Sequence, residues 1–289
     1  MSRFLSVYEA DINELTFPAD CDIITEGFLS DVIKSIRVAI SKAFKALCKI
    51  IVAAWNAILK GLRIARTKIM AFIDKVTDKP KENLPALMEY SSTVKTDGKV
   101  IDVDQLSAEM EELHMICTTQ LRKILMTGLS DTTTYTKKID AEWLLTYMDF
   151  GANERGVIQY PKAKIIAQKK YQDAEDADKL VTIDDLYVMK FRNWLDKNLD
   201  KFDAYNKESI KELGSLEHEI SKYFGNARVN SQSVDQLTPE QSEVLIYNRN
   251  ILYSATGFVA EKVRSINILI EDSWDAVLDY SWKRLKEKL

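Results

Sequence analysis

The spacing of apolar residues between positions 33 and 72 constrains the fold more than any other feature of this sequence. Its eleven steps of three or four residues cover 39 residues, a mean step of about 3.5, which is the period of an α-helix. Residues 80 and 85 are prolines and end the pattern. The sequence therefore predicts a long amphipathic helix over residues 30–79. The track consists of Ile33, Ile36, Ile40, Phe44, Leu47, Ile51, Ala54, Ile58, Leu62, Ala65, Ile69 and Phe72.

A second track of basic residues follows another face of the same segment. Residues 32–73 contain nine bases and no acid, whereas residues 1–31 contain seven acids and one base. The whole chain has a net charge of −4, so an acidic leader over residues 1–29 precedes a basic helix. This asymmetry favours charge pairing within the chain or with a partner. The basic positions expected to face a partner or lipid are Lys34, Lys42, Lys45, Lys49, Lys60 and Arg63.

Four interpretations of this basic face are open. It is the water-exposed side of a core helix, or it docks on an acidic protein surface, including the chain's own leader. It can also lie on an anionic membrane, with Phe44, Trp55 and Phe72 entering the lipid interface. Nucleic acid is the least supported main partner, because the chain is acidic overall. A membrane span is not expected, since the uncharged run 50–59 is half of the roughly 20 residues required.

The remaining chain predicts a helical body over residues 86–289. Only 9 glycines and 5 prolines occur in 289 residues, which leaves room for long helices. Helical patterns cover residues 104–127, 139–150, 182–224 and 238–289, and a loop is expected over residues 151–163. The expected fold is mainly α: long amphipathic helices packed as a bundle, with at most one small β-hairpin near 94–101.

Local signals set the expected ends of these elements. Asp97-Gly98 is a primed-turn hairpin signal. Gly128 is expected to end one helix and Thr182 to cap the start of another. Thr238-Pro239-Glu240-Gln241 has the form of a capping box at the start of the last helix.

Residues with catalytic or metal-binding potential are few. His114 ends a Glu-x-x-His spacing, but a helical di-iron site needs a second copy, so we expect His114 on a water-exposed helix face. Cys21, Cys48 and Cys117 show no disulfide or zinc spacing and favour a reducing compartment. Phosphate-binding glycine loops and nucleophile elbows do not occur. We therefore expect no enzymatic activity, no metal and no cofactor.

The leader carries a resemblance to a known class of protein. Tyr8-Glu9-Ala10-Asp11 and Ile23-Ile24-Thr25-Glu26-Gly27 precede the lysine-rich helix. Over the first 70 residues or so, this arrangement resembles the N-termini of virion and internal head proteins of large tailed bacteriophages. The resemblance implies a head-targeting leader that a maturation protease cuts after Glu26. Ile24 would then be the recognised apolar residue and Gly27 the new N-terminus.

The expected function is that of a non-enzymatic structural or assembly protein. The resemblance implies a head or internal virion component, assembled in the host cytoplasm and held by helix-mediated contacts. Its expected partners are other virion proteins or further copies of itself in a homo-oligomer. The alternative is a peripheral membrane-active protein that inserts its basic helix into anionic lipid. A third possibility is an enzyme with an unrecognised site, which a deep pocket with strongly perturbed carboxylates would indicate.

Overall fold

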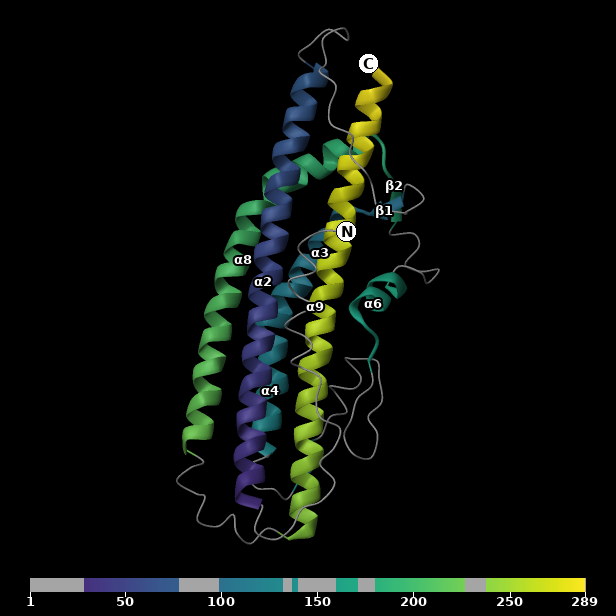
Figure 1. The fold of residues 1–289 in the computed structure, drawn as a ribbon. Helices are drawn as coiled ribbons and strands as arrows, with labels where there is room; N and C mark the ends of the chain where they lie inside the picture. The colour runs from purple at the N-terminus through teal and green to yellow at the C-terminus, as the bar shows by residue number, and fades with distance from the viewer. Residues whose placement is uncertain are drawn as a thin grey trace.

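The computed structural model describes residues 29–77, 99–131, 137–139, 160–170, 180–226 and 238–288, and these form an elongated helical bundle (Figure 1). Helices α2 (Leu29–Thr77), α8 (Asp185–Asn226) and α9 (Pro239–Lys288) run along its length. A fourth row is made of α3 (Val103–Met115), the π-helical turn η3 (Ile116–Gln120) and α4 (Leu121–Asp131). At 1.5 Å per residue, the 49-residue α2 is about 75 Å long. The prediction of a mainly α bundle is confirmed.

Helix α9 contacts α2, α3, α4 and α6 (Ala163–Lys169). The apolar track predicted for α2 faces this core, and all nine of its members with described side chains are buried. Trp55 of α2 lies within this core and is fully buried. Helix α2 therefore shares one hydrophobic core with α8 and α9. The nine buried members are Ile40, Phe44, Leu47, Ile51, Ala54, Ile58, Leu62, Ala65 and Ile69.

Side-chain caps fix the starts of two long helices. The capping box of α9 is confirmed: the Thr238 amide donates to Gln241 Oε1 at 2.9 Å, and the Gln241 amide donates to Thr238 Oγ1 at 3.3 Å. The cap expected at Thr182 is wrong. The amide of Tyr187 donates instead to Asp184 Oδ1 at 2.7 Å, and Thr182 ends strand β2 (Leu180–Thr182). A carboxylate two residues later competes better for the free amides and the positive end of the helix dipole.

The small sheet joins segments that are far apart in sequence. Strand β1 (Lys99–Ile101) pairs antiparallel with β2, with Val100 opposite Val181. The Asp97-Gly98 turn lies outside the described residues, so the described partner of β1 comes from about 80 residues downstream. The Tyr187 hydroxyl donates to the Ile101 carbonyl at 2.6 Å and ties the sheet to α8.

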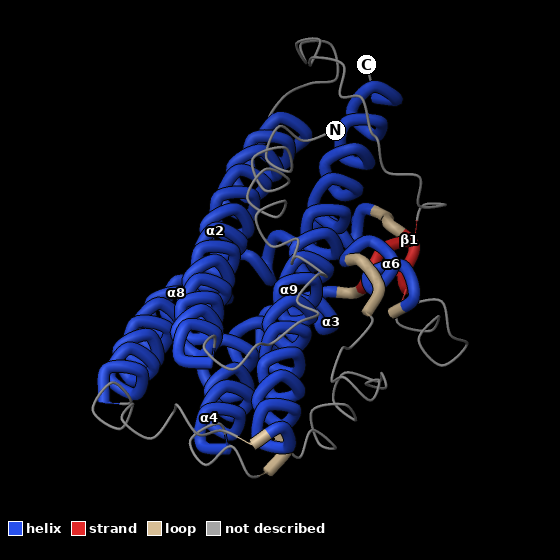
Figure 2. Tube along the Cα trace, turned by 60° about the horizontal axis from the view of Figure 1, so that its bottom comes forward, coloured by secondary structure: helices blue, strands red, loops and turns tan. Residues whose placement is uncertain are grey.

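Other element boundaries also differ from expectation. Helix α4 continues past Gly128 to Asp131, so the predicted end at Gly128 is wrong. Helix α6 was not expected from the sequence, and Figure 2 shows it beside α9 and β1. Of the helix expected over 139–150, only Ile139 is described. Ile139 is buried, and its amide donates to Oδ1 of the fully buried Asn248 at 2.7 Å.

Candidate functional surface on helix α2

The predicted basic positions of α2 lie on the outside of the bundle. Lys42, Lys45, Lys49, Lys60 and Arg63 are all exposed, and we call this row the basic stripe. Its steps of three, four, eleven and three residues keep it on one face of the helix. Lys34 falls on the same face by spacing, although its side chain lies outside the described part. From Lys42 to Arg63 the row extends about 32 Å at 1.5 Å per residue.

One edge of α2 is joined to α8 by ion pairs. Arg63 Nη2 lies 2.5 Å from Asp203 Oδ1, and Arg66 Nε lies 2.6 Å from Asp196 Oδ1. Lys45 Nζ lies 3.8 Å from a Glu217 carboxylate oxygen. These contacts use two of the predicted positions, Lys45 and Arg63, together with Arg66, which the sequence analysis did not single out. The acids recur at multiples of seven residues on α8, so that heptad spacing could have predicted the seam.

The stripe keeps positive charge after this pairing. Within the described part of the chain, Lys42 and Lys49 lie against no acid. Helix α2 carries ten lysines and arginines but only Asp31 and Asp74 as acids. The two bridged arginines are themselves about half exposed, so solvent and salt screen their pairs. The outer face of α2 therefore keeps exposed positive charge, in particular at Lys42 and Lys49.

The aromatic residues of α2 point away from this surface. Phe44 is 1% exposed and Trp55 is 0% exposed, so both belong to the core. The side chain of Phe72 lies outside the described residues. In this fold, Phe44 and Trp55 cannot enter lipid unless α2 leaves the bundle. Across the described residues, no helix has the length and apolar character needed to span a bilayer.

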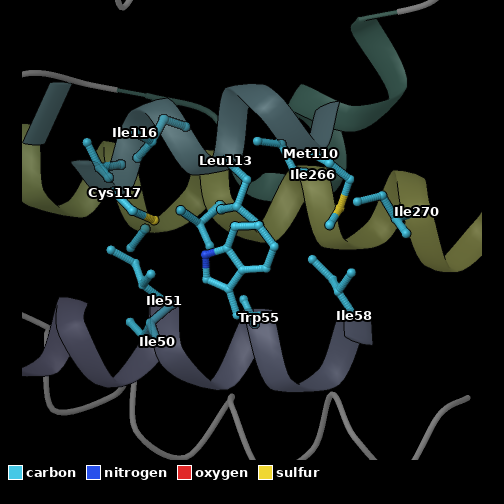
Figure 3. Close-up of a cluster of buried hydrophobic side chains, with 14 of the residues drawn as sticks. Ile50, Ile51, Trp55, Ile58, Met110, Leu113, Ile116, Cys117, Ile266 and Ile270 are labelled. Atoms are coloured by element: carbon cyan, nitrogen blue, oxygen red, sulfur yellow. The ribbon is translucent and has the colours of Figure 1, made fainter. Parts of the chain in front are cut away.

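The buried side of α2 meets the π-helical turn at Cys117. Figure 3 shows the Trp55 indole nitrogen pointing toward the Cys117 sulfur. Burial raises the pKa of Cys117 to about 12, against smaller opposing contributions from Trp55 and the Ser209 hydroxyl. Burial, followed by the nearby Glu217 charge, raises the pKa of Cys48 to about 12 as well. Both groups stay protonated thiols near neutral pH, so neither is an activated nucleophile.

His114 is not on a water-exposed helix face, and that expectation is corrected. Its imidazole stacks on Tyr205, with ring centroids 4.0 Å apart and planes 4° from parallel. Its Nε2 lies 3.4 Å from Glu208 Oε2, and the side chain is only 16% exposed. Glu111, the acid of the Glu-x-x-His spacing, pairs instead with Lys201 at 2.7 Å. In the described ranges, no group of three or more histidine, cysteine or acidic residues is placed to hold a metal ion.

A buried ion network that the sequence analysis missed attaches α6 to α3 and α9. Lys170 Nζ lies 2.6 Å from Glu109 and 2.8 Å from Glu112, and Lys262 Nζ lies 2.6 Å from Glu112. The side chain of Glu109 is 3% exposed. Burial raises the pKa of Glu112, but attraction to Lys170 and Lys262 outweighs burial and leaves that pKa below its ordinary value. The sequence feature that could have predicted this network is Glu109, an acid three residues after Leu106 and therefore on the apolar face of α3.

A second buried acid fixes the start of α6. Glu261 accepts a hydrogen bond from the Ala163 amide at 2.7 Å and one from Arg264 Nη1 at 2.7 Å. Beside it, the Tyr160 hydroxyl lies against Gly257, where a β-carbon would come within 1.8 Å of the hydroxyl oxygen. These contacts hold α6 and α9 together.

The expected cleavage motif, Ile24, Glu26 and Gly27, lies outside the described residues. Searches of protein family models, curated proteins and solved structures each found no match to this chain.

Proposed function

We propose that this chain is a non-enzymatic structural or assembly protein that joins an acidic protein surface through the basic stripe of α2. The observation that carries the proposal is the basic stripe itself, an exposed row about 32 Å long from Lys42 to Arg63 on the outer face of the bundle. Extended charge rows of one sign favour selective association with complementary surfaces and repel like-charged ones.

The charge of the stripe limits the partner. Two copies facing each other through identical stripes would repel, so a symmetric contact of stripe on stripe is disfavoured. Self-association must therefore bring the stripe of one copy to an acidic region of another. The chain has 44 acids against 40 bases while residues 32–73 contain no acid, so acidic surface is available on a second copy.

The leader supplies the reason to place this activity in a bacteriophage virion. Its Ile24-Thr25-Glu26-Gly27 sequence and the basic helix that follows resemble head and internal virion proteins. We accordingly propose assembly in the host cytoplasm, with other virion proteins or further copies as partners.

The test is a charge reversal of the stripe with a matched control. Lys42→Glu combined with Lys49→Glu reverses two exposed positions of α2, and Lys190→Glu combined with Lys197→Glu makes the same change on exposed positions of α8. Light scattering would give the mass of each full-length protein at low and high salt. We expect a defined oligomer, or a complex with a purified virion protein, that high salt and the α2 variant weaken and the α8 variant leaves intact.

Two results would overturn the proposal. One is a monomer at every salt concentration that binds no acidic virion protein. The other is flotation with anionic liposomes that the α2 variant abolishes, since that result assigns the stripe to lipid. The burial of Phe44 and Trp55 weighs against lipid insertion, because each buried aromatic contributes about 1.5–3 kcal/mol that would be lost when α2 leaves the core.

A further inference from the structure

We propose that Arg264 of α9 binds a small oxyanion, a carboxylate or a phosphate, through the edge of its guanidinium that carries Nε and Nη2. The Arg264 side chain is 16% exposed, and its Nη1 donates to Glu261 Oε1 at 2.7 Å. Its Nε and Nη2 are shielded from water, and neither has a hydrogen-bond partner in the part of the chain that the structure describes. Buried donors are normally hydrogen-bonded, so this edge is suited to an acceptor from outside the chain.

The geometry of the open edge fixes the chemical class of the ligand. The Nε–H and one Nη2–H of an arginine point in parallel, and they fit two oxygens of one carboxylate or phosphate group. A water molecule offers a single oxygen, and a chloride ion has no pair of acceptor atoms. The edge of Arg264 therefore favours an anion that carries two oxygens on one central atom.

The charges around Glu261 favour one further negative charge. Two cations share this carboxylate: Arg264 at 2.7 Å and Lys162 at 3.8 Å. The neighbouring network of α3, α6 and α9, by contrast, joins two acids to two lysines. Burial lowers the pKa of Arg264, although Glu261 and Tyr160 oppose this shift, so the single carboxylate does not fully offset the cost of burying the guanidinium. A bound anion would supply the remaining compensation.

Tyr160 places a hydroxyl close to these charges. Gly257 allows the approach, because a β-carbon at that position would come within 1.8 Å of the Tyr160 hydroxyl oxygen. Burial and then the charge of Glu261 raise the pKa of Tyr160, while Arg264 opposes the rise, so the hydroxyl lies within electrostatic reach of both charged groups. A hydroxyl at this place can donate a further hydrogen bond to an anion on Arg264.

An anion can reach Arg264 only through a local opening, because the two free nitrogens are shielded from water. Helix α6 lies beside α9 (Figure 2) and is joined to the site through Glu261, which also accepts from the Ala163 amide at 2.7 Å. The buried residues of α6 are two alanines, Ala163 and Ala167, so moving this helix exposes little apolar surface. We therefore expect the anion to enter on the α6 side.

Isothermal titration calorimetry of the full-length protein with sodium acetate and with inorganic phosphate tests the site. Sodium chloride at equal ionic strength is the reference, because chloride carries the charge without the paired oxygens. Arg264→Lys keeps the positive charge and removes the fork of donors. Lys42→Glu combined with Lys49→Glu is the matched control, since it reverses exposed charges of α2 and leaves Arg264 unchanged.

We expect one acetate or phosphate ion to bind per chain, above the chloride reference. Arg264→Lys should weaken this binding about 10- to 100-fold, the effect of losing charge-assisted hydrogen bonds, and the α2 variant should change it by no more than about twofold. The absence of saturable binding by both ions would overturn the inference. Binding that the α2 variant abolishes and Arg264→Lys leaves intact would also overturn it. The site does not use the basic stripe, so this inference and the proposed function can fail independently.

Urea unfolding in chloride checks that Arg264→Lys is folded. If it is not, ¹⁵N-arginine labelling of the unaltered protein takes its place. The bound ion should then shift an arginine Nε–H resonance that Tyr160→Phe also shifts, because Tyr160 lies within electrostatic reach of Arg264. An ion that shifts no such resonance would contradict binding at Arg264.

Discussion

Gly61 of α2 lies beneath the indole of Trp274 of α9, and a β-carbon at position 61 would come within 2.1 Å of Trp274 Cη2. The absence of a side chain at this position lets the two long helices approach at the ring. A glycine inside a helical pattern can mark a bend or a split, but α2 runs through Gly61 without a break.

Gly61→Ala should therefore destabilise the fold. Overpacking against Trp274 is expected to lower the free energy of unfolding by about 1–3 kcal/mol. The higher helix propensity of alanine offsets about 1 kcal/mol of this loss. Gly214→Ala is the matched control, since no atom lies within 4 Å of a β-carbon there, and it should stabilise α8 by about 0.5–1 kcal/mol. Urea unfolding measures both changes. Equal stabilisation by the two variants would contradict the close approach at Trp274.

Removing Lys170 should weaken the attachment of α6. Lys170→Met leaves the buried Glu109 without this cation, and we expect a loss of about 2–3 kcal/mol because Lys170 is itself one-third exposed. Lys169→Met changes the exposed neighbouring residue and should stay within about 0.5 kcal/mol of the parent protein. Urea midpoints at neutral pH would compare them. A similar loss in both variants would show that the network contributes no specific stability.

The same network predicts a pH dependence. The folded-state pKa of Glu112 is lowered, so its contribution is present above its unfolded value of about 4.3 and is lost as the pH falls through the folded value. The pKa of Lys170 is raised, because the pull of Glu109 and Glu112 exceeds the opposing effect of burial. Its contribution is present below the unfolded value of about 10.4 and is lost at still higher pH. Lys170→Met should reduce both the acid and the alkaline loss of the free energy of unfolding, measured by urea unfolding at a series of pH values. An unchanged pH dependence would refute the attribution of these losses to the Lys170–Glu112 pair.

The α2–α8 seam should contribute modestly and depend on salt. A double-mutant cycle on Arg63 and Asp203 is expected to give a coupling of about 0.2–1 kcal/mol at low ionic strength, as for other exposed pairs. The coupling should shrink in 1 M salt, where the screening length is about 3 Å. A cycle on Lys42 and Asp203 is the control, because Asp203 pairs with Arg63. Equal coupling in the two cycles would mean that general charge, rather than the direct contact between Arg63 and Asp203, stabilises the seam.

Cys48 and Cys117 should resist alkylation in the native protein. With a pKa near 12, only about one thiol in 10⁴ is ionised at pH 8, whereas an ordinary cysteine is about one-quarter ionised. Iodoacetamide treatment followed by peptide mapping should therefore show labelling slowed by about a thousandfold. Both residues should react readily in urea. Rapid native labelling of Cys117 would be incompatible with its burial beside Trp55.

The sequence predicted the features that depend on periodicity and local capping. The apolar track of α2 and the Thr238 capping box both follow from residues close together in the chain, and both are found. The features it missed depend on tertiary contacts. The partner of Val100 is Val181, and Lys170 is fixed by acids about 60 residues away, which no local pattern reveals. Asp184, and not Thr182, caps the start of α8. Thr182 belongs to strand β2, where it pairs with Lys99, a residue far away in the sequence.

The pairing of α2 with α9 also determines when the chain can fold during synthesis. About 160 residues separate the end of α2 from the start of α9. At 5–20 residues per second, a ribosome needs about 10–30 s to make that interval. The apolar side of α2 consequently emerges from the ribosome well before α9, and within that interval only α8 and the shorter helices can pack on it. The contact between α2 and α9 can therefore form only after α9 has emerged, whatever part of the core the earlier helices have already built.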